Sequence, residues 1–242
     1  MSDDASPELE PMPEDWERAL AVVAHPDDME YGASSAVARW TDAGKDVAYL
    51  IVTRGEAGID ALSPAEAAAV RGEEQRTACD AVGVRTLEFL DHPDGTVEYG
   101  VALRGDITTV IRRHRPELVL TLNHRETFGP GALNMADHRA VGQATIDAVR
   151  DAANRWVFPD AGEAWHGVRW VAVSGSPQPT HAVDITDTLD RGVESLLAHR
   201  AYLEGLGSGP MADPGAFLRS MATSTGERAG VAMATAFELF PM

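Results

Sequence analysis

Short apolar runs alternate with amphipathic segments along most of the chain. The runs have the length of strands, and most carry few polar residues, which is typical of strands buried on both faces of a sheet. They cover residues 19–24, 46–53, 85–90, 118–122, 168–173 and 182–185. The segments with helical periodicity and helix end signals cover residues 34–43, 64–81, 101–114, 137–154 and 187–206.

This order of elements predicts the class of fold. Alternating strands and helices build a mostly parallel sheet with helices on both faces. We therefore expect a single Rossmann-like α/β domain over residues 16–242 and a disordered, acidic leader over residues 1–15. We expect a Gly- and Pro-rich loop at 205–215 to form a lid or a pocket wall, with Met- and Ala-rich helices at the C-terminus.

Composition and charge exclude several classes of partner. The chain has 242 residues, 20 basic and 38 acidic, and a net charge of −18. Nucleic acids and anionic membrane surfaces require clustered Lys and Arg, so neither is expected as a partner. The single cysteine, Cys79, excludes a disulfide framework and a cysteine zinc cage. No run is long enough for a membrane span, and the N-terminal residues lack the features of a signal peptide, so we expect a cytoplasmic protein.

The strongest chemical signal directly follows the first apolar run, in the segment Ala24-His25-Pro26-Asp27-Asp28-Met29-Glu30. Open α/β sheets bind ligands at the carboxyl ends of their strands. His25 and Asp28 can reach one divalent metal from a tight turn, while Asp27 can stay off the metal and take a proton from water. The alternative is that His25 caps the turn and both aspartates cap the next helix.

A metal site with three protein ligands needs one more group. His138 is the best candidate, because Asp137-His138 opens a helix that follows the fourth strand. An isolated Asp-His pair at a helix start is more often a cap, but the first motif favours a shared site. Imidazole and carboxylate ligands suit Zn²⁺, although Fe²⁺, Co²⁺ or Ni²⁺ accept the same types.

Several further segments occur together with these two motifs. They read Thr53-Arg54-Gly55-Glu56-Ala57-Gly58, Arg71 with Glu74, Val82-Gly83-Val84, Asp91-His92-Pro93-Asp94-Gly95 and Asp137-His138-Arg139-Ala140-Val141. With the AHPDDME segment and in this order, the sequence resembles the LmbE/PIG-L family of zinc-dependent N-deacetylases over roughly residues 18–200. The resemblance implies a catalytic domain over residues 16–242.

The resemblance also implies roles for individual residues. His25, Asp28 and His138 match the metal ligands of the family, and Asp27 matches the general base that activates water. Arg71 matches the arginine that holds the sugar of the substrate.

Two positions leave alternatives open. Glu56 is expected near the pocket, and its alternative is a loop carboxylate that accepts backbone hydrogen bonds. Met135 stands where the family usually has a histidine that stabilises the oxyanion, and a thioether donates no hydrogen bond. We expect His124 to supply a replacement donor, although it could be an exposed loop histidine. Asp137 is placed among the catalytic residues, because in the family it orients the histidine that is missing here; the alternative is a carboxylate that orients a ligand histidine.

The function that the resemblance implies is hydrolysis of an N-acetyl or related N-acyl group on a sugar-like small molecule. An amidase of thiol-sugar conjugates and a metal-binding protein without hydrolytic activity are the alternatives. Retention of Asp27 favours an enzyme, and the absence of G-x-G-x-x-G after the first strand argues against a dinucleotide enzyme. The acidic charge favours a neutral or cationic substrate, and assembly into a homo-oligomer is left open.

Overall fold

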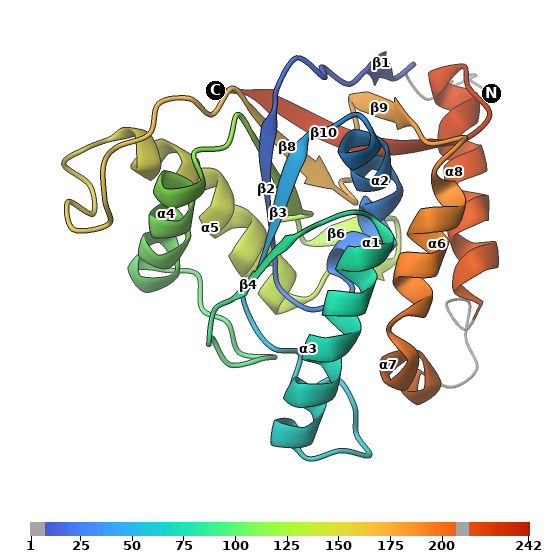
Figure 1. The fold of residues 1–242 in the computed structure, drawn as a ribbon, viewed down its shortest axis with the longest axis horizontal. Helices are drawn as coiled ribbons and strands as arrows, with labels where there is room; N and C mark the ends of the chain where they lie inside the picture. Colours follow the sequence, from blue (N-terminus) through green and yellow to red (C-terminus); the bar gives the residue numbers. More distant parts are fainter. Residues whose placement is uncertain (1–7, 207–212) are drawn as a thin grey trace.

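The computed structural model describes residues 8–206 and 213–242. Within them, one sheet has the strand order β1-β9-β10-β8-β5-β2-β3-β4 (Figure 1). Its strands are β1 (Glu10–Pro11), β2 (Arg18–Val23), β3 (Asp46–Ile51), β4 (Thr86–Phe89), β5 (Leu118–Leu122), β8 (Trp170–Ser174), β9 (His181–Asp184) and β10 (Ala234–Pro241). Its neighbours pair in parallel, except that β10 runs antiparallel to both β8 and β9. The predicted mostly parallel sheet is therefore confirmed.

Helices cover both faces of the sheet. Figure 1 shows α4 and α5 on one face and α2, α6 and α8 on the other. The helices are α1 (Asp28–Gly32), α2 (Ser34–Asp42), α3 (Pro64–Ala81), α4 (Val101–His114), α5 (Ala136–Ala153), α6 (Leu189–Leu197), α7 (Arg200–Gly205) and α8 (Pro214–Ala229). The α3 helix begins with the capping box that Ser63 and Glu66 predict. None of the helices in the described ranges is long and apolar enough to cross a membrane.

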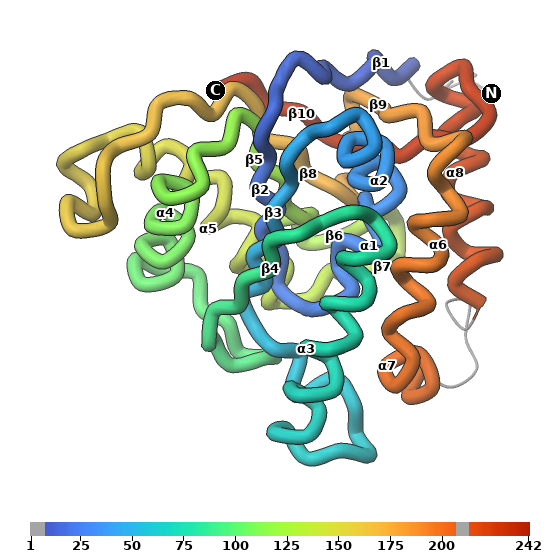
Figure 2. The backbone as a smooth tube through the Cα atoms, in the orientation of Figure 1, coloured from blue at the N-terminus to red at the C-terminus, as the bar shows by residue number. Residues whose placement is uncertain are grey.

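The order of connections creates a switch point beside β2. This strand pairs with β3 on one side and with β5 on the other. The chain leaves β2 into α1 and α2, whereas it leaves β5 toward α5 on the opposite face (Figure 2). The carboxyl ends of β2 and β5 are therefore neighbours, and the segments that follow these two strands diverge toward opposite faces of the sheet. Such a crevice is where open α/β sheets place ligands.

Two predictions about the ends of the chain are wrong in part. Residues 8–15 do not form a disordered leader, because β1 pairs with β9 and the side chains of Leu9 and Met12 are buried; residues 1–7 lie outside the described ranges. The C-terminal region is not only helical. Strand β10 lies between β8 and β9, where it is hydrogen-bonded on both sides. Pairing with these distant strands outweighs the local sequence preference for a helix.

Two other segments differ from their predictions. The helix expected over 187–206 is divided into α6 and α7 at Ala198 and His199, where the fully buried His199 ring lies beside Glu30. The polar loop after β5 contains a short hairpin of β6 (Thr127–Gly129) and β7 (Ala132–Leu133). Of the loop expected at 205–215, residues 207–212 lie outside the described ranges, and Pro214 already begins α8.

Close packing of α5 on the end of β5 gives a stability prediction. A Cβ atom at Gly142 would lie 2.6 Å from the Leu122 carbonyl oxygen and 2.9 Å from the His124 Cβ. Gly142→Ala should therefore lower the free energy of unfolding by about 1–3 kcal/mol, because the helix must shift. Gly72→Ala on α3 is the matched control, since the nearest atom lies at 4.0 Å. It should raise that free energy by up to about 1 kcal/mol, and denaturant unfolding that gave both variants the same sign would contradict this packing.

Candidate metal centre

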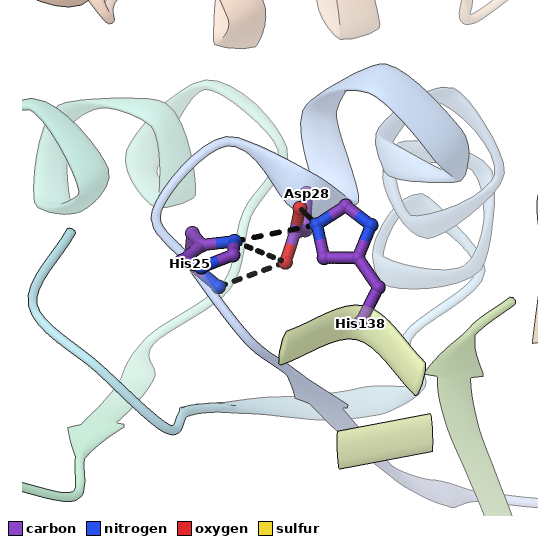
Figure 3. A group of neighbouring side chains, drawn as sticks. All are labelled: His25, Asp28 and His138. Atoms are coloured by element: carbon purple, nitrogen blue, oxygen red, sulfur yellow. Dashed lines mark hydrogen bonds and ion pairs between the residues drawn. The ribbon is translucent and has the colours of Figure 1, made fainter. Parts of the chain in front are cut away.

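Three predicted ligands meet at the switch point. His25 follows β2, Asp28 is the first residue of α1, and His138 lies in the first turn of α5 (Figure 3). One potential ligand atom from each lies within 4.8 Å of the other two. His138 Nε2 is 3.1 Å from Asp28 Oδ1 and 3.3 Å from His25 Nδ1. The structure thus brings together side chains that are more than a hundred residues apart in the sequence.

Backbone hydrogen bonds hold the Asp28 carboxylate in place. Its Oδ2 accepts from the N–H groups of Ala24 and His25, at 3.0 and 2.8 Å. These bonds leave Oδ1 directed at His138. The turn after β2 therefore fixes one carboxylate oxygen and presents the other, which is the arrangement that a metal ligand requires.

The two histidine rings present nitrogen lone pairs to each other. His25 Nε2 lies 3.0 Å from Asp94 Oδ1 and 3.3 Å from Asp137 Oδ2. His138 Nδ1 lies 3.1 Å from Asn134 Oδ1. These acceptors fix the N–H on the outer nitrogen of each ring. The inner nitrogens, 3.3 Å apart, are then both acceptors, and a cation between them and Asp28 satisfies all three groups.

The electrostatics of the cluster favour positive charge. Burial opposes a charge on His25, but hydrogen bonds to Asp137, Asp28 and Asp94 outweigh it and raise the pKa of His25 to about 12. The negative charge of these carboxylates stabilises a proton on His25, and it would stabilise a metal cation bound there for the same electrostatic reason. The ligand types and the charge of the cluster therefore fit a divalent metal.

Asp137 has the contacts of an orienting carboxylate. Its two oxygens accept from the backbone N–H groups of Gly95 and Val97, at 2.7 and 3.1 Å, and Oδ2 also faces His25. His25, Asp94 and Asp137 form a second group close enough to hold a metal. However, the Asp137 oxygens already accept backbone hydrogen bonds, so this group more naturally fixes the His25 ring.

Asp27 lies beside the ligands but points elsewhere. Its φ of 94° is in the left-handed region, which turns its side chain away from that of Asp28. Asp27 Oδ1 lies 3.3 Å from Arg71 Nη2, and Oδ2 is buried without a hydrogen-bond partner among the described residues. Burial raises the pKa of Asp27 to about 7, and the Arg71 charge opposes the rise. A carboxylate of this kind is suited to exchange protons near neutral pH.

Arg71, on α3, and Glu56 both hydrogen-bond to backbone groups of the loops around the site. Arg71 is only 3% exposed, donates to the carbonyl oxygens of Pro26 and Gly55, and lies over the ring of Tyr202 at 4.3 Å. Glu56 accepts from the N–H groups of Arg54 and Asp94. The contacts of Glu56 match the alternative of a loop carboxylate. Those of Arg71 show a guanidinium that carries the charge opposite Asp27.

The predicted replacement for the oxyanion histidine is not tested by these contacts. His124 is half-buried beside Gly142, and its Nδ1 has no hydrogen-bond partner among the described residues. Met135 is 54% exposed at the N-terminus of α5. The ring of Phe128 lies edge-on to that of His138, with ring centroids 6.1 Å apart. The role of His124 stays a prediction.

Sequence reasoning missed two side chains that orient the predicted ligands. Asn134 accepts from His138 Nδ1 and donates to the carbonyl oxygens of Asn123 and Arg125. Asp94 faces His25 Nε2 from the loop after β4. Asn134 stands four residues before His138 but precedes the N-cap of α5, so the spacing of side chains along a helix does not predict the contact. Asp94 lay in a quoted motif, but nothing in the local pattern connects it with His25.

A separate cavity lies behind α1. Its volume is about 380 Å³, and none of the predicted site residues lines it. Its wall is mixed, with apolar groups such as Tyr31, Phe128 and Met221 and polar groups such as Ser35 and Thr225. The proposed metal ligands are therefore not inside this cavity, although Glu30 and Tyr31, which line it, follow Asp28 in α1.

Comparison with known proteins agrees with this geometry. The family model described as PIG-L, GlcNAc-PI de-N-acetylase, matches residues 20–149, just over half of the chain. The chain belongs to the PIG-L family. The matched range includes most of β2, all of β5 and all three predicted ligands.

Named relatives of this PIG-L chain act on acetylated amino sugars. It is 31% identical to the diacetylchitobiose deacetylase of Thermococcus kodakarensis, over 77% of this chain and 70% of that one. It is 28% identical to a probable N-acetyl-alpha-D-glucosaminyl L-malate deacetylase 2 of Bacillus cereus, over 77% and 84%. The structure of N,N'-diacetylchitobiose deacetylase from Pyrococcus horikoshii superposes with a TM-score of 0.85 at 25% identity, covering 94% of this chain and 85% of that one.

Asn134 gives a prediction that separates orientation from ligation. His138→Ala removes a direct ligand and should lower Zn²⁺ affinity by more than about 100-fold, whereas Asn134→Ala should lower it by about 10- to 100-fold. Competition titration of metal-free protein against a chromophoric chelator measures both. Asn154→Ala, beyond the far end of α5, is the control and should bind as the parent does. Parent-like affinity of His138→Ala would show that the ligand assignment is wrong.

Proposed function

We propose that this chain is a metal-dependent hydrolase that removes the N-acetyl group from a GlcNAc-containing small molecule. The observation that carries the proposal is that His25, Asp28 and His138 lie close enough to share a metal ion. Beside them is the buried carboxylate of Asp27, which faces Arg71 and is not in this group of potential ligands. The named relatives support the substrate class, because they deacetylate amino sugars. We propose Zn²⁺ as the metal, and Fe²⁺, Co²⁺ and Ni²⁺ as ions that the same ligands accept.

The residues around the metal position divide the chemistry between them. His25, Asp28 and His138 would hold the ion, which supplies a Lewis acid for the acyl oxygen and lowers the pKa of water. Asp27 accepts the proton as the water attacks the acyl carbon. The C–N bond then breaks, and Asp27 returns the proton to the leaving amine, so that an amine and acetate are released. Arg71 balances the negative charge that Asp27 carries before it takes the proton and after it gives the proton up.

A panel of substrates tests the proposal. Metal-loaded protein is given N-acetylglucosamine, diacetylchitobiose, N-acetylglucosaminyl glycosides and thiol-sugar conjugates, and the released amine is measured. Amine and acetate in equal amounts from an N-acetyl sugar are expected. Release only from thiol-sugar conjugates would favour an amidase, and metal binding without any release would favour a non-hydrolytic protein. A cytoplasmic location stays a prediction, and assembly into a homo-oligomer stays open.

Asp27→Asn gives the most direct test of the base. The amide cannot take a proton from water, so kcat should fall by about 10² to 10⁴. Zn²⁺ affinity should stay near that of the parent, because Asp27 is not among the proposed ligands. Glu73→Gln, on the exposed side of α3, is the matched control. Full turnover by Asp27→Asn with bound metal would exclude this role.

His124→Ala tests the replacement for the missing oxyanion histidine. Loss of one oxyanion donor costs about 2.7–4 kcal/mol of transition-state stabilisation, so kcat should fall by about 10² or more without loss of metal. His166→Ala is the control, since this histidine lies in the segment before β8 and far along the chain from the ligands. A crystal structure with substrate analogue in which the His124 ring cannot reach the acyl oxygen would refute the role.

A further inference from the structure

A buried glutamine lies directly behind the proposed base. Gln75 on α3 accepts a hydrogen bond from the backbone N–H of Asp27 at its Oε1, at 3.0 Å. Its Nε2 donates to Glu30 Oε1, also at 3.0 Å. Gln75 has no exposed surface, and neither end of its amide reaches solvent. It therefore connects the backbone of Asp27 with a carboxylate two residues beyond Asp28.

The chemistry of the two ends requires an amide. The Asp27 N–H is a donor and needs an acceptor, whereas the Glu30 carboxylate is an acceptor and needs a donor. Only a side chain with one acceptor and one donor at its tip satisfies both. This pairing also fixes the amide orientation, because the reverse would set two donors and two acceptors against each other.

The backbone of Asp27 needs such support. Its φ of 94° is a conformation that residues with a side chain rarely adopt. The same conformation turns the Asp27 side chain off the ligand cluster and toward Arg71. Arg71 donates to the Pro26 carbonyl oxygen, so α3 holds this turn from both sides of the peptide that links Pro26 and Asp27.

The connection continues to the C-terminal helices. Glu30 is almost fully buried, and its Oε1 also accepts from Ser195 Oγ on α6, at 3.4 Å. Its Oε2 lies 3.7 Å from His199 Nε2, at the break between α6 and α7. The orientation of the Gln75 amide is therefore fixed by groups that come from α1 and α6 at once.

We propose that Gln75 is a positioning residue, which holds the Asp27 backbone in the conformation that aims its carboxylate at the reacting water rather than at the metal. The inference rests on the proposed function, because it needs Asp27 to act as the base. It predicts that Gln75 affects turnover through Asp27 alone. Metal binding depends on other contacts, and Gln75 itself has no exposed surface through which it could contact a substrate.

A double-mutant cycle tests this dependence. Gln75→Leu in the metal-loaded protein should lower kcat by about 10- to 100-fold, because a misplaced group costs this much. KM and Zn²⁺ affinity should stay near those of the parent. In the Asp27→Asn background, Gln75→Leu should cause no further loss, since the group that it positions is already gone. Glu73→Gln, on the same helix, should have no effect in either background.

A charge swap provides rescue and guards against a folding defect. Gln75→Glu alone sets two carboxylates together and should lower kcat, whereas the double variant Gln75→Glu/Glu30→Gln restores a donor and an acceptor at the right ends and should recover most of it. Thermal unfolding identifies variants that fail to fold, and Gln75→Met then replaces Gln75→Leu.

The outcomes separate the two proposals. Parent-like kcat in a folded Gln75→Leu variant would overturn the positioning role, and so would an equal loss in the Asp27→Asn background. A parent protein that hydrolyses none of the N-acyl sugars refutes the proposed function, and the inference then falls with it. Turnover by the parent with either of the first two results refutes only the inference.

Discussion

The parallel pairing of β2 with β3 on one side and β5 on the other is the constraint on which the site depends. It brings the carboxyl ends of β2 and β5 together, while the helices that follow them leave on opposite faces. Polar groups that would be costly inside the sheet can gather there without disturbing its core. His25 and Asp28 come from one side of this crevice and His138 from the other. Because α5 packs through Gly142 against the end of β5, the position of His138 is fixed by backbone contact.

A second constraint is the negative charge that the crevice contains. Asp28, Asp94 and Asp137 surround His25, and all three have little exposed side chain. Buried carboxylates are destabilising unless hydrogen bonds or cations compensate for them. Backbone N–H groups of the loops after β2 and β4 supply part of this compensation. Of the three carboxylates, Asp28 presents its Oδ1 to the inner nitrogen of His138, whereas Asp94 and Asp137 face the outer nitrogen of His25. The loop hydrogen bonds therefore place one carboxylate among the proposed ligands and two behind a ligand ring.

The sequence predicted the parts of the site that depend on local pattern. The apolar runs located β2 and β5, and the segment after β2 contained two proposed ligands and the proposed base within four residues. The sequence could not predict which side chains contact the proposed ligands and base from other parts of the fold. Asn134, Asp94 and Gln75 matter to the site only through contacts with residues of other segments, namely His138, His25 and Asp27. Strand β10 and the helix break at His199 were not predicted for the same reason, because contacts with distant residues override the local preference there.

The contacts of Arg71 bear on how a substrate sugar can be recognised. The resemblance to the family assigns this arginine to the sugar, but its guanidinium already donates to two backbone carbonyl oxygens and faces Asp27. Burial alone would raise the pKa of Asp27, and the Arg71 charge is the largest influence that opposes this rise. If Arg71 turned outward to a sugar hydroxyl, Asp27 would lose that charge and its pKa would rise further. A smaller fraction of the carboxylate would then be ionised and able to accept a proton at neutral pH. The same donors therefore cannot serve both partners in full, and in this chain the geometry gives them to the backbone of Pro26 and Gly55 and to Asp27.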